Sequence, residues 1–241
     1  MSSQSNLIAL CRLPGASSGR AERREATAIA LADRVMKTAG APAQLTLLIG
    51  IDEPRQLNLY RDGDDYSPPF DFALRMAATT PGILIEAGSD LADVAEDWSV
   101  FKVGTTSMKD RATPPAGEVP GIHMLHPLWF HEDLPRSVLL RSWREIHADL
   151  ALRVHVGATS YEQHLVENTL VPGVAPPYGG FSEFHFPSER APFEGYFDSD
   201  RGRTEIRHDI RHFIKGVPPR LFAREIRIGA PAPQLTPQQT D

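Results

Sequence analysis

The sequence has one cysteine, no long apolar segment and no excess of basic residues. Because Cys11 is the only cysteine among 241 residues, the chain can form neither an internal disulfide nor a cysteine-based zinc or iron–sulfur site. No apolar run approaches the roughly 20 residues that cross a bilayer, and the start of the chain lacks the pattern of a secretory signal. The formal net charge is −6, and no basic cluster is present. We therefore expect a cytoplasmic protein that binds neither membranes nor nucleic acid.

The motifs of several enzyme classes are also missing. The sequence contains no G-x-x-x-x-G-K-[ST] loop for a nucleotide phosphate, no G-x-G-x-x-G fingerprint and no G-x-S-x-G nucleophile turn. Imidazole, carboxylate and phenol groups remain, and these groups transfer protons without help from a cofactor. We therefore expect no cofactor, although the histidines leave a haem protein open as an alternative.

Histidine is absent from the first 122 residues, and all nine histidines lie between His123 and His212. If imidazole carries the chemistry of this protein, the second half of the chain contains the active site.

The second half alternates strand and helix patterns in a fixed order. Apolar runs and periodicity predict strands at 122–130, 159–171, 181–188 and 220–228, and helices at 134–154 and 203–214. This β-α-β-β-α-β order is that of a ferredoxin-like unit.

The first half permits the same order, which indicates a tandem duplication. Strands are predicted at 6–14, 43–52, 70–78 and 99–108, with helices at 21–40 and within 83–98. The predicted fold class is therefore α+β, with two tandem β-α-β-β-α-β units. We expect the domains to be 1–110 (first unit, without histidine), 111–120 (linker), 121–229 (second unit) and 230–241 (disordered tail).

Three short motifs in the second half resemble EthD-like proteins. They are WREIHADLA at 143–151, the Tyr-x-Gln strand YEQH at 161–164, and YFDSDRGR at 196–203 before the second helix. The resemblance covers residues 120–228 by motif and residues 5–108 by topology alone. It implies the dimeric α+β barrel fold, in which the sheets of two units face each other with helices outside. The resemblance favours a homodimer, and a monomer stays open because both units lie in one chain. Members of this superfamily have many activities, so the fold does not decide the function.

The stretch RHDIRHFI at 207–214 places two histidines four residues apart, as zinc-binding helices do. Helical periodicity places His208 and His212 opposite the apolar stripe of Ile206, Ile210 and Phe213. They should face water, and we expect no metal site.

His147 is the strongest catalytic candidate. It lies beside the apolar stripe of Leu139, Trp143, Ile146 and Leu150, one turn after Trp143. It is either a structural histidine or a base that faces a pocket between helix and sheet, where burial would keep it neutral. The match to the EthD-like pattern favours the second interpretation.

Other candidates lie on the strands of the second unit. His126, His164 and His185 are candidates for a second proton-transfer group, and Tyr161 is a candidate hydrogen-bond donor. Alternation along a strand places His164 on one face with Glu162, and Tyr161 on the other with Gln163. The candidate substrate-binding residues are Trp129, Trp143, Glu183 and Phe184. Three further histidines, His123, His131 and His155, lie near element ends and are predicted to be on the surface.

These residues predict a cofactor-independent lyase or isomerase that acts on a small apolar molecule bearing a carbonyl or a phenol. His147 would be the general acid or base, and Tyr161 would stabilise developing negative charge. A cofactor-free monooxygenase and a non-catalytic small-molecule-binding protein remain alternatives.

Overall fold

A computed structural model describes residues 5–15, 20–38, 42, 44–51, 69–78, 82–89, 91, 94–112, 114, 116–174, 177–216 and 218–229. The predicted tail, 230–241, lies outside these residues. In the described part of the chain, no helix is long and apolar enough to span a membrane.

The first unit has the predicted element order. It comprises β1 (Ser5–Arg12), α1 (Arg20–Lys37), β2 (Leu45–Gly50), β3 (Phe72–Ala78), α2 (Gly82–Ser89) and β4 (Asp97–Lys109). The helix predicted within 83–98 ends at Ser89, and Trp98 at the end of that range lies in β4 instead.

The second unit repeats the order with additions. It comprises β5 (Gly117–Phe130), α3 (Arg136–Leu140), the π-helix η1 (Arg141–His147), α4 (Ala148–Val154), β6 (Ser160–Val171), β7 (Gly180–Phe186), α5 (Ala191–Glu194), α6 (Asp200–Ile210), β8 (Ile214–Gly216) and β9 (Leu221–Ile228). Because β5 begins at Gly117, the last part of the predicted linker 111–120 lies in a strand.

The strands of the two units form one closed antiparallel barrel. The order is β7-β6-β4-β1-β3-β2-β9-β5, and β5 pairs with β7 to close the ring. The pairs β4–β6 and β2–β9 join the two units. A closed ring leaves none of these strands as a free edge, which protects the sheet from pairing with other chains.

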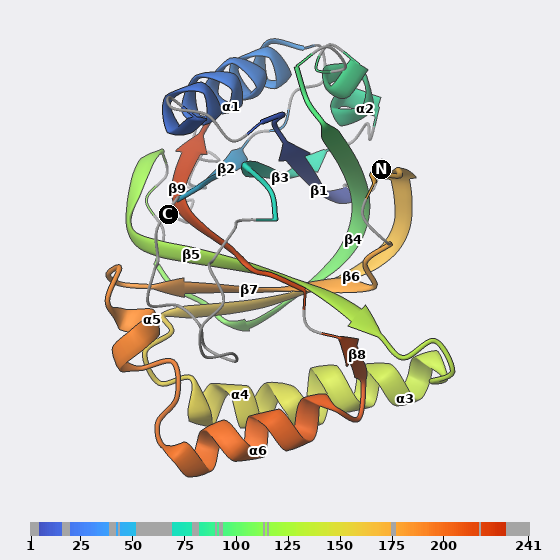
Figure 1. Ribbon diagram of the computed structural model, residues 1–241, viewed down its shortest axis with the longest axis vertical. Coiled ribbons are helices and arrows are strands. Elements are labelled where there is room, and N and C mark those ends of the chain that lie inside the picture. Colours follow the sequence, from blue (N-terminus) through green and yellow to red (C-terminus); the bar gives the residue numbers. More distant parts are fainter. Residues whose placement is uncertain are drawn as a thin grey trace, which may run out of the picture.

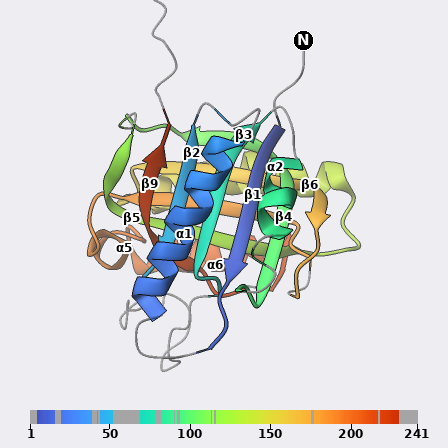
Figure 2. The same cartoon turned by 90° about the horizontal axis from the view of Figure 1, so that it is seen from above.

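The molecule has three layers, with the barrel between two pairs of helices. Helices α1 and α2 cover the sheet of the first unit, and α4 and α6 cover the sheet of the second (Figure 1). Seen from above, α1 lies over β2 and β3, with β1 beside it (Figure 2). The central parts of the sheets are therefore covered by helices outside and by the opposite strands inside, whereas the ends of β4, β5 and β6 include exposed residues.

The apolar core is divided accordingly. One cluster lies under α1 and α2, and two lie under α3–α6. A fourth fills part of the barrel interior and includes Ile8, Leu10, Phe101, Leu125 and Phe181. One face of the second unit's sheet therefore packs against helices, and the other face lines the barrel interior. Each candidate side chain lies on one of these two faces.

The long helix of the second unit is irregular at its centre. Residues 141–147 form π-helical turns, with hydrogen bonds from residue i to i+5. Ile146, predicted in the apolar stripe, is 52% exposed, whereas His147 is buried. The wider turns rotate Ile146 outward and leave His147 in line with Trp143, so this part of the predicted stripe is corrected. Such π-helical segments are frequent at functional sites.

The second covering helix is shorter than predicted. α6 begins after Ser199, whose Oγ accepts a hydrogen bond from the Gly202 backbone N–H at 3.0 Å. This serine of the YFDSDRGR motif is therefore an N-cap. α6 ends at Ile210, and Ile214, predicted as its last residue, begins β8, which pairs with β5. His208 and His212 are exposed, as predicted.

Gly121 should tolerate alanine poorly. Both Gly121 (φ +106°) and Gly117 (φ +94°) have positive φ, which disfavours any Cβ. A Cβ on Gly121 would overlap the carbonyl oxygen of Phe186, whereas one on Gly117 would meet nothing. We expect Gly117→Ala to lower the free energy of unfolding by about 1 kcal/mol, and Gly121→Ala by about 1–3 kcal/mol more because of the overlap. Urea unfolding measures both, and equal losses would contradict the proposed clash.

Candidate functional site

The polar candidates of the second unit are divided between the two faces of its sheet. His126, Tyr161 and Gln163 face the helices, whereas His164, Glu183 and His185 face the barrel interior. Of the three candidates for a second proton-transfer group, His126 alone lies on the same side of the sheet as His147, because strand alternation places His164 and His185 on the other face.

On the helix-facing side, His147 and Asp209 form a pair. Nδ1 of His147 lies 2.7 Å from Oδ2 of Asp209, and both side chains are largely buried. The His147 ring packs edge-on against Phe213, with ring centroids 5.2 Å apart. A carboxylate that accepts a hydrogen bond from Nδ1 fixes the ring and leaves Nε2 as the atom that exchanges protons.

A row of three polar residues crosses the sheet under these helices. His126 pairs in register with Ser182, and Ser182 pairs with Gln163. Among the described residues, neither Nε2 of His126 nor Oε1 of Gln163 has a hydrogen-bond partner, although both atoms are buried. Buried polar atoms without partners are costly, and a bound polar molecule would supply the missing hydrogen bonds.

The charge state of His126 is set by its surroundings. Burial, the charge of Arg220 and the charge of His147 lower its pKa well below the usual value for histidine. His126 is therefore neutral at pH 7, and a neutral imidazole has one donor and one acceptor nitrogen.

Tyr161 lies beside this row. Its ring stacks on Phe184, with centroids 4.3 Å apart, and its hydroxyl accepts a hydrogen bond from Nε2 of Gln163 at 2.6 Å. The same nitrogen donates to the backbone oxygen of Trp143. Burial raises the pKa of Tyr161 to about 12, so the phenol keeps its proton and can donate it in a hydrogen bond. Trp143, itself fully buried, packs against Phe130.

On the barrel-facing side, Glu183 is the centre of a charged cluster. Its two oxygens lie 2.7 Å from Nε2 of His123 and 2.9 Å from Nε2 of His164. Arg75 from the first unit lies 2.7 Å from Glu183 and also contacts Glu162. Although burial opposes it, the charges of Arg75 and His123 hold the pKa of Glu183 well below its usual range.

The cluster extends to Glu225 on β9. Oε2 of Glu225 lies 2.9 Å from Nδ1 of His123, and its side chain also pairs with Arg111 and Arg227. Burial alone would raise the pKa of Glu225, but His123 and the two arginines lower it. Burial alone would lower the pKa of His123, but Glu183 and Glu225 raise it. The barrel interior is thus half apolar and half ionic.

His123 and His155, predicted on the surface, are buried, and this prediction is wrong. His123 joins the ionic cluster, and Nδ1 of His155 lies 2.5 Å from the backbone oxygen of Tyr196 under α6. Their positions near strand and helix ends suggested exposure. In a barrel covered by helices, however, those ends are enclosed on both sides. His131 is partly exposed.

Buried neutral histidines predict a loss of stability in weak acid. Burial lowers the pKa of His155 to about 3 and that of His185 to about 4. Unfolded histidines bind protons near pH 6.5, so below this pH the unfolded state binds more protons and the free energy of unfolding falls. His123, whose pKa is raised, has the opposite effect.

His155→Asn should therefore weaken this pH dependence. Between pH 6.5 and 4.5 we expect the variant to lose about 2 kcal/mol less stability than the wild type. Urea unfolding at several pH values measures the difference. His208→Asn is the control, because its side chain is exposed in the fold. If the free energy of unfolding changed with pH equally in wild type and His155→Asn, the lowered pKa of His155 would be refuted.

Trp129 lies away from the row under the helices. Its ring stacks on Tyr178, with centroids 6.0 Å apart and planes 16° apart, and both pack on the apolar part of the barrel interior. Trp129 is therefore on the opposite face of the sheet from Trp143 and Phe184.

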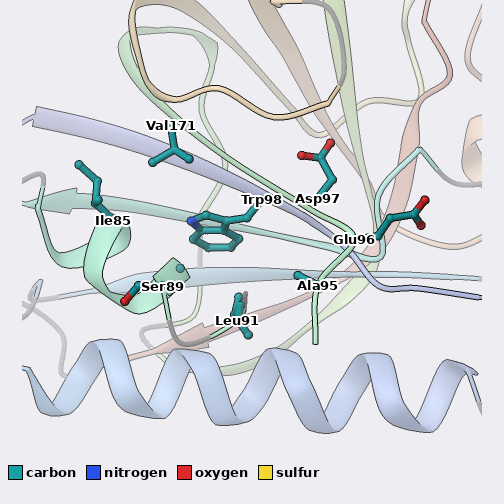
Figure 3. Close-up of a pocket in the computed structure, with 9 residues that line it drawn as sticks. Ile85, Ser89, Leu91, Ala95, Glu96, Asp97, Trp98 and Val171 are labelled. Atoms are coloured by element: carbon teal, nitrogen blue, oxygen red, sulfur yellow. The ribbon is translucent and has the colours of Figure 1, made fainter. Parts of the chain in front are cut away.

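A separate hollow of about 350 Å³ lies in the first unit, between α2 and β4. Trp98 stands among Ile85, Leu91 and Val171, with Asp97 and Glu96 towards one end (Figure 3). Among the described residues, its lining contains no histidine and no paired acid and base.

Comparisons with known proteins identify the fold. No family model and no curated protein sequence matches the chain. An anthrone oxidase-like protein of known structure is similar, with 10% identity and a TM-score of 0.57 over 94% of this chain and 93% of that one. A variant of chlorite dismutase from Candidatus Nitrospira defluvii matches with 12% identity and a TM-score of 0.51 over 93% and 92%. The chain has the tandem dimeric α+β barrel fold that the resemblance implied.

Proposed function

We propose that the protein is a cofactor-independent lyase or isomerase, with its active site under α4 and α6 of the second unit. The observation that carries this proposal is the His147–Asp209 pair, which lies on the same side of the sheet as His126 and Gln163, two residues with buried atoms lacking partners. A positioned base opposite unsatisfied polar groups is the arrangement that proton-transfer enzymes use.

Each residue has a defined role in this proposal. Nε2 of His147 removes a proton either from the carbon next to a carbonyl group or from a phenol hydroxyl. In the first case the C–H electron pair forms the enolate double bond and the carbonyl π pair moves onto the oxygen, and in the second the oxygen keeps the O–H electron pair. His126 and Tyr161 donate hydrogen bonds to that oxygen. His147 then returns the proton to a different carbon in an isomerisation, or to a leaving hydroxyl in a dehydration, which releases water. His164 and His185 have no role here, because they face the barrel interior.

A haem does not fit beside His147. Trp143 lies so close to β7 that a Cβ on Gly180 would be 2.9 Å from its Cη2 atom. Phe130 and Phe213 pack around the same rings. Among the described residues, aromatic side chains thus fill the space that a porphyrin would need.

The proposal is tested by metabolite depletion. Purified wild type and His147→Ala are incubated with phenolic, polyketide-like and terpenoid compounds, and product masses are followed. We expect the wild type to convert a compound about 10²–10⁴-fold faster than His147→Ala does. This is the range of general acid–base catalysis. Full activity of a folded His147→Ala variant would refute the proposal.

The mass change separates the alternatives. Isomerisation leaves the mass unchanged and dehydration lowers it by one water. A gain of oxygen with oxygen consumption would instead indicate the monooxygenase. Binding without conversion by either protein would indicate a small-molecule-binding protein.

We also expect the chain to form a homodimer. Because the barrel closes within one chain, a second copy would pack through helices or loops and not through barrel strands. Light scattering of the purified protein measures this.

A further inference from the structure

We propose that the barrel interior contains a binding site for a divalent transition-metal ion, formed by Glu162, His164 and Glu183. This site lies on the opposite face of the sheet from His147 and does not depend on the proposed function.

The ligand atoms are already close together. One donor atom from each of Glu162, His164 and Glu183 lies within 4.8 Å of the others. Ligands bound to one ion at about 2.0–2.2 Å are about 3–4 Å apart, so small side-chain rotations would suffice. His123 contacts the other oxygen of Glu183 and lies outside this group of three.

His164 has the outer hydrogen bond that a metal ligand needs. Its Nδ1 lies 2.9 Å from Oγ1 of Thr105, and its Nε2 lies 2.9 Å from Oε2 of Glu183. When an ion replaces the hydrogen bond between Nε2 and Glu183, the ring can keep its proton on Nδ1 and donate it to Thr105, which leaves Nε2 as the ligand atom. Metal-binding histidines almost always have such an outer hydrogen bond.

The ligands lie on adjacent strands. Glu162 and His164 lie on β6, and Glu162 is directly paired with Glu183 on β7. His164 and Glu183 are at most 2% exposed. A site built on packed strands keeps its geometry when an ion binds.

Arg75 competes with the ion for this site. Its guanidinium contacts both Glu162 and Glu183 and so supplies the positive charge that the two carboxylates need. Its side chain is 20% exposed, so it has a route toward solvent. We infer that Arg75 moves outward when a cation binds, and that the ion takes over its role of neutralising the carboxylates.

The donor set determines the class of ion. One imidazole nitrogen with carboxylate oxygens suits zinc, iron, cobalt or manganese, whereas calcium and magnesium prefer oxygen ligands alone. The site therefore selects a divalent transition metal over the more abundant alkaline-earth ions.

The test is a titration of chelator-treated full-length protein with Zn²⁺ in a calorimeter and with Co²⁺ followed by its visible absorption. We expect one equivalent to bind to the wild type and to His147→Ala. Arg75→Gln removes the competing charge and should bind about 10-fold more tightly or better. His164→Gln should lose binding, and a doubled substitution of the exposed pair, His208→Ala with His212→Ala, should keep it.

Three results would overturn the proposal. They are no binding by either wild type or Arg75→Gln, binding that persists in His164→Gln, and binding that disappears with the exposed pair. If His164→Gln fails to fold, the comparison between wild type and Arg75→Gln decides alone, because a site elsewhere would not respond to Arg75.

Discussion

Glu183→Gln is expected to lower the free energy of unfolding by about 3–5 kcal/mol at pH 7, the cost of removing one partner from a buried ion pair. The amide would leave Arg75 and His123 inside the barrel without the carboxylate that both contact. Urea unfolding followed by circular dichroism measures the loss, with the m-value as a check that the transition remains two-state.

The effect should depend on pH with a defined sign. Because the pKa of Glu183 in the folded protein is well below its unfolded value, its contribution to stability is present above about pH 4.5 and is lost as the pH falls. The difference between wild type and Glu183→Gln should therefore shrink in acid.

Glu118→Gln provides the matched control. Glu118 also pairs with an arginine, Arg224, but its side chain is 54% exposed. Its loss should change stability by no more than about 1 kcal/mol. A similar small effect at Glu183 would mean that the barrel interior is hydrated and that its ion pairs contribute little.

Asp209→Asn is expected to reduce turnover of the substrate found by depletion by about 10²–10⁴-fold, while leaving the fold intact. Asparagine nearly matches aspartate in size, but its amide can also donate a hydrogen bond to Nδ1 of His147. The ring would then hold its proton on Nε2, which could no longer act as a base. Asp209 is a positioning residue in this scheme, since it acts through His147.

The tautomer of the His147 ring distinguishes this positioning role from a purely structural role of Asp209. Nitrogen NMR of the histidine rings, recorded where His147 is neutral, reports which nitrogen carries the proton. We expect Nδ1–H in the wild type and a shift toward Nε2–H in Asp209→Asn. Asp149→Asn, on an exposed position of α4, should change neither the tautomer nor the rate. An unchanged tautomer in Asp209→Asn would contradict the proposed role.

Periodicity predicted the architecture well, because each element buries one face in a regular way. Both β-α-β-β-α-β units are present, and the alternation that separates Tyr161 from His164 on β6 is confirmed. What alternation does not show is which face meets the helices. Strand β7 is buried on both faces, so a polar residue such as Glu183 occurs on a face that is also buried.

The stretch RHDIRHFI shows that the pattern within one element does not predict contacts with other elements. Its two histidines are exposed, as their helical positions predicted. The acid between them, Asp209, contacts His147, which is distant in sequence. Arg75 likewise comes from the half of the chain without histidine. Both partners depend on how elements pack, and no local pattern marks them.

The closure of the barrel within one polypeptide has an evolutionary consequence. In a barrel assembled from two identical subunits, every substitution appears twice, so an acidic residue near the symmetry axis tends to oppose its own copy. Here the two halves are separately encoded and can diverge. Arg75 on one half lies opposite Glu162 and Glu183 on the other, and the first half need not repeat this arrangement for the second. A barrel closed within one chain can therefore have a different arrangement of charge on each half of its interior.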